Sequence, residues 1–275
     1  MKMQKKLTPF DVERTRANLA QRLEFDELRK MYTTVYPQIP DQNSPNLWNV
    51  LNLNEKPLIT SNPMEDERLK IVTHFIKGAN LQILNIGFGS GNLEQTYFSN
   101  HTDKNIHWYG IDISEKSVDK VQHDYPKGKF SVGNILNLKF PKDHFDYVTS
   151  LEVLEHIPPS HIMNALSEVF QILKQGGFFI LSVPLNEGLE EMIARGENPN
   201  AHVRVYTPEL IEAELRLAGF RILDENLLFA FHTLHNIKSF IAKYSIIKKW
   251  KPNNIVILAQ KPDSLGCRTL KYERS

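Results

Sequence analysis

"LQILNIGFGSGNLEQ" (residues 81–95) places three glycines, Gly87, Gly89 and Gly91, at alternate positions directly after an apolar run. The run predicts a buried β-strand, and the residues after Gly91 predict a helix. Glycine at such a junction permits positive φ and a close approach of the backbone to a ligand. The spacing G-x-G-x-G is one residue shorter than the dinucleotide fingerprint G-x-G-x-x-G. The stretch predicts either a nucleotide site or a tight strand-to-helix turn without a ligand.

From about residue 64 onward, apolar strand patterns alternate with amphipathic helix patterns. Strands separated by helices imply a parallel sheet with right-handed crossover connections. We expect Gly78 to close the first of these helices and the glycine pair 176–177 to end a later one. The strand patterns lie at 81–87, 106–114, 128–135, 145–153, 178–184, 221–231 and 253–261. The helix patterns lie at 64–78, after Gly91, and at 115–125, 159–177, 207–220 and 237–250.

The first sixty residues follow a different pattern. Residues 8–36 have apolar side chains at a spacing of three to four and predict a helix that begins at Thr8 and Pro9. Prolines and asparagines in the next stretch predict an irregular connector. We therefore expect an N-terminal helical extension with its connector (1–63), an α/β domain (64–261) with insertions at about 186–206 and 232–252, and a C-terminal tail (262–275).

Composition excludes several classes of protein. The formal net charge of the 275 residues is +1, so no overall field attracts nucleic acid or a membrane surface. The single cysteine, Cys267, cannot form an internal disulfide, which favours a reducing, cytoplasmic compartment. The N-terminal stretch lacks the apolar segment of a secretory signal, and no apolar run is long enough to span a bilayer.

Asp112 ends the second predicted strand of the domain, in "YGIDIS". In an open α/β sheet, ligands bind outside the carboxyl ends of the strands, where the strand order reverses. A carboxylate at that position can accept hydrogen bonds from both hydroxyl groups of an adenosine ribose. The alternative is that Asp112 only caps the following helix. Together with the glycine loop, Asp112 favours a nucleotide site.

With these residues in place, the chain resembles the class I S-adenosylmethionine-dependent methyltransferases over residues 64–261. The resemblance rests on five stretches in the same order as in the family: "ILNIGFGSG", "YGIDIS", "SVGNILNLKFP", "FDYVTSLEVLEHI" and "LKQGGFFILSVP". It implies a Rossmann-like, seven-stranded, mostly parallel sheet with an antiparallel last strand and helices on both faces. It also implies that S-adenosylmethionine binds at Asn85, Gly87, Phe88, Gly89, Gly91, Asp112, Ile113, Asn134, Ile135 and Leu151.

Two positions depart from the pattern of the family. An acidic residue is common where Asn85 stands, and an aspartate is common where Asn134 stands. The resemblance implies that the first helps to hold the amino group of the cofactor and that the second accepts from the adenine amine. An asparagine carbonyl still accepts hydrogen bonds, but without the assistance of a charge. We therefore expect the cofactor to bind more weakly rather than not at all.

The stretch "LEVLEHIPPSH" places Glu152, Glu155 and His156 where the fourth strand ends. The pattern E-x-x-E-H resembles a divalent-metal site in ubiquinone-type O-methyltransferases and in small-RNA 2′-O-methyltransferases, which add a later histidine where His202 stands. Two carboxylates and two imidazoles suit a divalent metal. We favour the interpretation without a metal, in which His156, His202 and Glu152 are the catalytic candidates. The alternative for the acidic residues and His156 is a purely structural role in the loop.

The reaction that the resemblance implies is the in-line displacement of a sulfonium methyl group by an O, N or C nucleophile. We expect a small-molecule acceptor. A metal-dependent RNA 2′-O-methyltransferase is the first alternative, and the near-zero net charge disfavours it. A cofactor-binding protein without turnover is the second, supported by the two asparagines. A nicotinamide oxidoreductase is the third, and the short glycine spacing disfavours it.

Two further stretches are candidates for contact with a substrate or a partner. The loop at 186–206 is long for a strand-to-helix connection, and Arg204 and Tyr206 alternate with His202, so all three are expected to face one cleft. The insert 236–251 combines five lysines with apolar residues. Such a helix can lie on an anionic membrane or touch RNA, but we favour a core face with solvated lysines.

Overall fold

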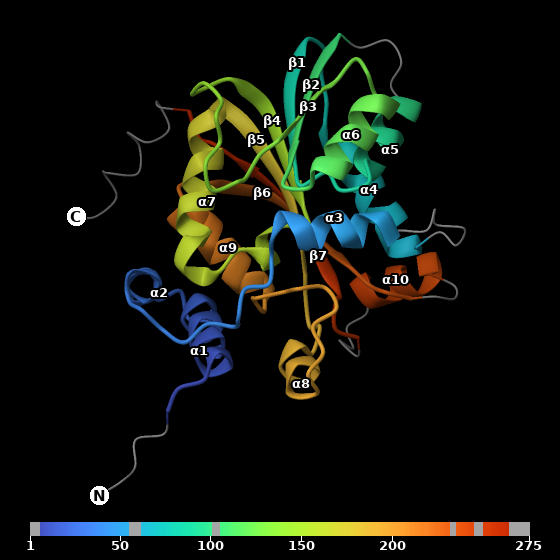
Figure 1. Ribbon diagram of the computed structural model, residues 1–275. Helices are drawn as coiled ribbons and strands as arrows, with labels where there is room; N and C mark the ends of the chain where they lie inside the picture. Colours follow the sequence, from blue (N-terminus) through green and yellow to red (C-terminus); the bar gives the residue numbers. More distant parts are fainter. Residues whose placement is uncertain (1–5, 55–61, 101–104, 232–234, 245–249, 264–275) are drawn as a thin grey trace, which may run out of the picture.

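A single seven-stranded sheet runs through the molecule, with helices on both faces (Figure 1). The computed structural model describes residues 6–54, 62–100, 105–231, 235–244 and 250–263. Cys267, Lys248, Lys249 and most of the tail lie outside these ranges. The strands are β1 (Leu81–Ile86), β2 (Ile106–Asp112), β3 (Lys129–Val132), β4 (Phe145–Leu151), β5 (Leu173–Pro184), β6 (Arg221–Leu228) and β7 (Asn254–Gln260).

The strand order β3-β2-β1-β4-β5-β7-β6 confirms the predicted fold class. Four neighbouring pairs, from β3 to β5, are parallel, whereas the last strand in sequence, β7, is antiparallel to both β5 and β6. The order of the strands reverses between β1 and β4. This switch point fixes the place of the site, because the carboxyl ends of β1, β2 and β4 diverge there and leave a crevice.

Helices cover the sheet in two layers (Figure 1). Side chains alternate along the strands, so Leu84 packs toward one layer and its neighbour Ile83 toward the other. Helices α2, α7 and α9 pack on the first face, and α4, α5 and α6 on the second. The helices are α1 (Pro9–Gln21), α2 (Phe25–Thr33), α3 (Pro45–Asn54), α4 (Pro63–Phe75), α5 (Asn92–Asn100), α6 (Glu115–Asp124), a 3₁₀ turn η1 (Leu154–His156), α7 (Pro159–Ile172), α8 (Leu189–Ala194), α9 (Pro208–Leu217) and α10 (His235–Tyr244).

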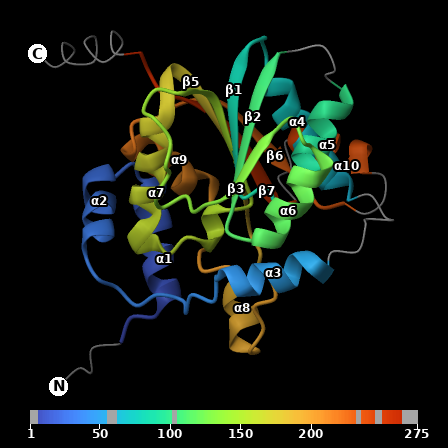
Figure 2. The same ribbon diagram turned by 45° about the horizontal axis from the view of Figure 1, so that its top comes forward.

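The N-terminal segment differs from its prediction in two ways. Its helix begins as expected, because the Thr8 hydroxyl accepts from the backbone of Asp11. The segment then breaks into α1 and α2 at Leu23, which has a φ of 61°, and the Glu24 N–H bonds to the carbonyl of Leu19. These contacts close the first helix without a glycine. The predicted connector contains α3, which both ribbon views place across the end of the sheet that holds the site (Figures 1 and 2).

The end of α7 also differs from its prediction. The helix stops at Ile172 rather than at the glycines, and β5 begins at once. The pairing of β4 with β5 is irregular just after this point, since Phe145 pairs with Leu173 while Tyr147 pairs with Phe178. Gly176 has a φ of 76° within this irregularity. The glycines therefore serve a bulge in the strand and not a helix end.

We expected the insert 236–251 to turn its apolar side chains into the core. This prediction is wrong for the apolar side chains of the insert that the structure describes. Ile237 and Phe240 on α10 are 59% and 64% exposed, whereas His235 on the same helix is buried against Glu67, with Nε2 2.8 Å from the carboxylate. Helix α10 thus turns its polar face inward because that face carries the ion pairs. Among the described residues, no helix combines the length and the apolar composition that crossing a bilayer requires.

Candidate active site

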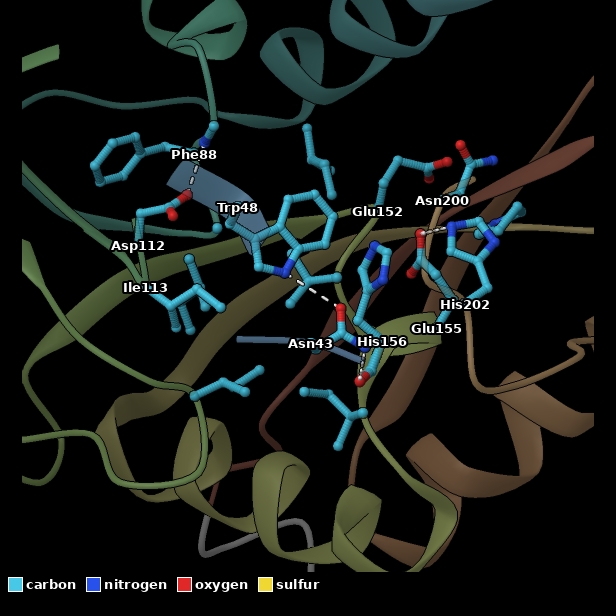
Figure 3. Close-up of a pocket in the computed structure, with 18 of the residues that line it drawn as sticks. Asn43, Trp48, Phe88, Asp112, Ile113, Glu152, Glu155, His156, Asn200 and His202 are labelled. Carbon is cyan, nitrogen blue, oxygen red and sulfur yellow. Dashed lines mark hydrogen bonds and ion pairs between the residues drawn. The ribbon is translucent and has the colours of Figure 1, made fainter. Parts of the chain in front are cut away.

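A cavity of about 810 Å³ lies at the carboxyl ends of the central strands. Its walls come from the ends of β1, β2, β4 and β5, from α3 and α4, and from the loop before α9. In Figure 3 the Trp48 indole lies between Asp112 on the left and Glu155, His156 and His202 on the right. The cavity therefore has a glycine-loop end and a histidine end.

Two of the three glycines line the cavity, and the third does not. Gly87 and Gly89 have φ values of 70° and 53°, and a Cβ on Gly87 would lie 2.4 Å from the side chain of Val153. A side chain at Gly87 therefore has no room. Gly91 lies outside the cavity, and a Cβ there would meet Val121 of α6 at 3.0 Å. Gly91 thus allows α5 to pack closely on α6, and its expected contact with the cofactor stays a prediction.

Asp112 lies directly beside the glycine loop. Its Oδ2 accepts a hydrogen bond of 2.9 Å from the Gly89 N–H, and its Oδ1 accepts one of 2.8 Å from the Ser114 N–H. Helix α6 is capped by the hydroxyl of Ser114, so the alternative in which Asp112 caps this helix through its side chain does not describe the structure. The carboxylate lines the cavity, and each oxygen retains lone pairs for a ligand.

Asn85 has a carboxyl partner that the sequence did not reveal. Its Nδ2 donates to Oε1 of Glu94 over 2.8 Å, and its Oδ1 accepts from the Thr149 hydroxyl over 2.9 Å. Glu94 is fully buried and also accepts from the Trp108 indole. Burial raises the pKa of Glu94. The resemblance places an acidic group on the first strand. In this structure the acidic side chain is Glu94, which belongs to α5 and hydrogen-bonds Asn85 of that strand.

The other predicted cofactor residues also line the cavity. Ile113 and Leu151 follow β2 and end β4. Asn134 and Ile135 follow β3, and the Asn134 Oδ1 accepts from the backbone N–H of Leu136. This bond occupies part of the acceptor capacity of the asparagine carbonyl. Phe88 contributes its backbone, because its ring packs against another aromatic ring in the core.

The histidine end gathers Glu155, His156 and His202. Their possible donor atoms all lie within 4.8 Å of one another. The Glu155 carboxylate is completely buried and neither oxygen has a hydrogen-bond partner among the described residues. Burial, with the nearby charge of Glu152, raises the pKa of Glu155 well above its ordinary value. Burial and then the charge of His202 lower the pKa of His156 to about 3, so His156 is neutral at pH 7.

Glu152 points to a different part of the same cavity. A φ of 56° turns the chain at this residue, so its side chain diverges from the 3₁₀ turn that follows. Its carboxylate pairs with Arg68 over 3.1 Å and accepts from Ser182 over 2.6 Å and from Asn254 over 2.9 Å. The structure therefore separates Glu152 from the other three members of the predicted set.

Three lining residues from the N-terminal half were missed from the sequence. Arg68 of α4 reaches the cavity wall, and Trp48 and Asn43 come from the predicted connector. The Trp48 ring meets the His156 ring edge to face at 4.8 Å and donates to the Asn43 Oδ1. Asn43 in turn donates to the carbonyl groups of His156 and Ala201. Trp48 had a weak sequence signal, since it is the one aromatic residue among the leucines and the valine of residues 45–54.

Arg204 and Tyr206 do not face the cleft, which corrects their prediction. The Arg204 side chain is fully buried and its guanidinium donates to Glu214 over 2.7 Å and 3.2 Å. Tyr206 shares the Glu214 carboxylate, which also accepts from Tyr32 of α2. Neither residue lines the cavity. The pair instead joins the N-terminal helices to α9.

Comparisons with known proteins agree with the architecture. A family model described as a methyltransferase domain matches residues 83–177. A probable S-adenosylmethionine-dependent methyltransferase of Mycolicibacterium smegmatis is 31% identical over 123 residues, which are 45% of this chain and 46% of that protein. The chain thus spans about half the length of the curated relatives that it matches first.

Solved structures share the fold at low identity. The [4+2]-cyclase SpnF has a TM-score of 0.59 and 19% identity, over 82% of this chain and 98% of that one. A phosphoethanolamine N-methyltransferase of Haemonchus contortus, bound to S-adenosylhomocysteine, has a TM-score of 0.54 and 18% identity, over 72% of this chain and 52% of that one. By its motifs, its strand order and its relatives, the chain contains a methyltransferase domain, matched over residues 83–177, and is similar to the class I S-adenosylmethionine-dependent methyltransferases.

Proposed function

We propose that this protein transfers the methyl group of S-adenosylmethionine to an O, N or C nucleophile of a small-molecule acceptor. The observation that carries the proposal is Asp112, which lines the cavity beside the glycine loop at the switch point of the sheet. A carboxylate there suits the two ribose hydroxyls of an adenosyl group. The fold alone does not decide the reaction, because a [4+2]-cyclase shares it.

In this proposal the cofactor lies along the glycine-loop end of the cavity. Asp112 holds the ribose, and Asn134 and Ile135 contact the adenine. The methionine part passes Gly87 toward the middle of the cavity. Arg68 supplies the only guanidinium or ammonium group among the described lining residues and suits the methionine carboxylate. Glu152 fixes Arg68 through their ion pair of 3.1 Å, so we give Glu152 a supporting role in place of a catalytic one.

The acceptor occupies the histidine end. Its nucleophilic atom bonds to the methyl carbon while the carbon–sulfur bond breaks, S-adenosylhomocysteine leaves, and the proton of the acceptor is released. The protein aligns the two reactants, and alignment of this kind contributes roughly 7–11 kcal/mol in favourable cases. His156 is a poor general base at neutral pH, because its pKa of about 3 leaves little affinity for a proton. His156 therefore contacts the acceptor as a neutral imidazole, and His202 lines the same end of the cavity.

The charge of the cavity favours a small molecule over RNA. An RNA backbone needs cations around its phosphates, and the one lining guanidinium among the described residues is already paired with Glu152. Carboxylates dominate the wall instead. They belong to Asp41, Glu65, Asp112, Glu152, Glu155 and Glu187.

Two measurements test the proposal in sequence. Calorimetry with S-adenosylhomocysteine tests the cofactor site, and the expected result is one molecule bound per chain. The protein is then incubated with methyl-labelled S-adenosylmethionine and with either the small-molecule fraction or the RNA fraction of a cell extract. Label in the small-molecule fraction supports the proposal. Label in RNA alone, or binding without transfer to either fraction, contradicts it.

A further inference from the structure

Helix α10 turns a stripe of apolar side chains toward the solvent, and the proposed reaction does not use it. The stripe consists of Ile237, Phe240 and Ile241, which are 59%, 64% and 45% exposed. They share one face of the helix because they are three and four positions apart. None of the three lines the cavity. An exposed group of large apolar side chains marks a surface that contacts a partner.

The opposite face of α10 is held against α4, which keeps the stripe on the outside (Figure 1). His235 and Ser239 are buried on that face. The Nε2 of His235 lies 2.8 Å from one oxygen of the Glu67 carboxylate, and the Nζ of Lys243 lies 2.7 Å from the other. Turning the helix to bury the stripe would break both ion pairs. The outward position of the apolar side chains is therefore fixed by the packing of the protein itself.

Cations border the stripe. The insert that contains α10 has five lysines and neither aspartate nor glutamate. Of the lysines that the structure describes there, Lys238 and Lys243 lie on opposite flanks of the stripe by the helical period, and Lys251 is exposed beyond the helix. On the neighbouring α4, Lys70 and Asp66 line the hollow beside the stripe. Positive charge is thus concentrated here, although the whole chain is nearly neutral.

Two aromatic rings beyond the helix extend the same surface. The Nζ of Lys238 is 5.9 Å from the centroid of the Phe231 ring, and this ring meets that of Trp250 edge to face at 5.7 Å. Tryptophan favours the headgroup level of a bilayer, where its ring is apolar and its N–H finds polar partners. Ala230 and Asn253, which flank the insert, line the cavity. The surface therefore adjoins the edge of the cavity.

An anionic lipid surface is the partner that fits this chemistry. A helix with aliphatic and aromatic residues on one face and lysines beside it buries the apolar face at the boundary between headgroups and acyl chains. RNA would meet the lysines but would leave Ile237 and Ile241 in water, because single-stranded RNA binds by phosphate contacts and by stacking on aromatic rings. A second copy of the chain, paired through the same face, would bring lysines opposite lysines.

We infer that α10 docks this protein on an anionic lipid bilayer, with the stripe among the upper acyl chains and Lys238 and Lys251 at the lipid phosphates. The inference goes beyond the proposed function and does not depend on it. The helix lies along the surface without crossing it, since its 10 residues are too few to span the hydrocarbon core. Docking would bring the adjoining edge of the cavity near the membrane.

The test is sedimentation of the full chain with vesicles, one set of equal parts phosphatidylglycerol and phosphatidylcholine and one set of phosphatidylcholine alone. We expect binding to the first set only, and weaker binding as the salt concentration is raised. Ile237→Ser/Phe240→Ser should weaken binding about 20-fold or more, because two large apolar side chains no longer enter the bilayer. Lys251→Gln should weaken it about five-fold, the effect of one lysine near an anionic surface.

Leu223→Ser and Lys139→Gln are the matched controls, because each makes the same kind of change at an exposed residue elsewhere, on β6 and in the loop before β4. Both should bind vesicles like the unaltered protein. No binding to the anionic vesicles, full affinity in Ile237→Ser/Phe240→Ser, or an equal loss in Leu223→Ser would each overturn the inference. Circular dichroism reports whether each variant folds, and Phe240→Ser alone replaces the double variant if that one does not.

Two further measurements on the same samples examine the other possible occupants of the surface. Analytical ultracentrifugation reports self-association, and a gel shift with single-stranded RNA reports nucleic-acid binding. A monomer that binds anionic vesicles and not RNA supports the inference. A dimer that Ile237→Ser/Phe240→Ser converts to a monomer, or RNA binding that Lys251→Gln weakens, would count against it.

Discussion

Replacing Asp112 with alanine separates the two functions of its carboxylate. One function is structural, because its oxygens accept from the N–H groups of Gly89 and Ser114 at 2.9 Å and 2.8 Å. The other is the proposed contact with the ribose. A hydrogen bond to a charged group contributes about 1.5–3 kcal/mol. The variant should therefore bind S-adenosylhomocysteine about 12- to 150-fold more weakly.

A chemical double-mutant cycle isolates the ribose contact. The unaltered protein and Asp112→Ala are each titrated by calorimetry with S-adenosylhomocysteine and with its 2′-deoxyribose analogue. If Asp112 holds the 2′-hydroxyl, the analogue loses affinity for the unaltered protein but loses little more for the variant. The coupling energy should then reach about 1.5 kcal/mol. Asp119→Ala, an exposed change on α6, controls for the loss of a charge nearby.

Additive losses would refute this reasoning. If removing the 2′-hydroxyl costs the same affinity in both proteins, the ribose does not touch Asp112. The carboxylate would then be only a support for the glycine loop. A lower melting temperature of ligand-free Asp112→Ala would still be expected, since two backbone N–H groups lose their acceptor.

Three other predictions concern the stability of the fold, its dependence on pH, and the tryptophan emission on ligand binding. Arg204→Met leaves the buried Glu214 carboxylate without its cation, so the free energy of unfolding, measured with urea, should fall by about 3–5 kcal/mol. The double variant Arg204→Met/Glu214→Leu should largely recover this loss. Losses that simply add in the double variant would contradict the prediction. Because burial raises the pKa of Glu94, its contribution to stability is full below the ordinary value of 4.5 and is lost as pH rises through the raised pKa. Glu94→Gln should reduce the dependence of the free energy of unfolding on pH, measured by urea unfolding at several pH values. An unchanged dependence on pH would count against the prediction. Trp48 lines the cavity, whereas Trp108 is buried. Trp48→Phe should therefore abolish the change in tryptophan emission on addition of S-adenosylhomocysteine. If the change persists, the Trp48 indole does not contact the ligand.

The parts of the fold that depend on local pattern could be predicted from the sequence. The strand Leu81–Ile86 and the turn at Gly87 follow from an apolar run and from glycine geometry, and these two rules operate within a few residues. Asp112 could be placed because the carboxyl ends of neighbouring parallel strands meet at one edge. The proximity of His156 and His202 came from the family resemblance rather than from spacing, since 46 positions along the chain carry no distance information.

What the sequence did not reveal depends on contacts between distant segments. The burial of Glu94 could not be predicted, because nothing near it in the sequence indicates that Asn85 and Trp108 both donate to it. Arg204 alternates with His202 and so seemed to share its cleft, but a carboxylate on α9 holds it in the core. The sequence did not predict a role for Glu187 for the same reason, since its partner His202 lies 15 residues further along the same loop.

The placement of α3 has a consequence for how this protein can be altered. Trp48 and Asn43 line the histidine end, yet they precede the sheet in the chain, and the Asn43 side chain donates to the carbonyl groups of His156 and Ala201, in the turn after β4 and the loop before α9. The glycine loop and Asp112 belong to the sheet itself. In the proposed function, the segment 41–54 therefore shapes the acceptor end together with His156 and His202, whereas the glycine loop and Asp112 supply the nucleotide end. Exchanging residues 41–54 should alter the range of acceptors, provided that Asn49 is kept, because its Oδ1 accepts from the hydroxyl of Ser114, two residues after Asp112.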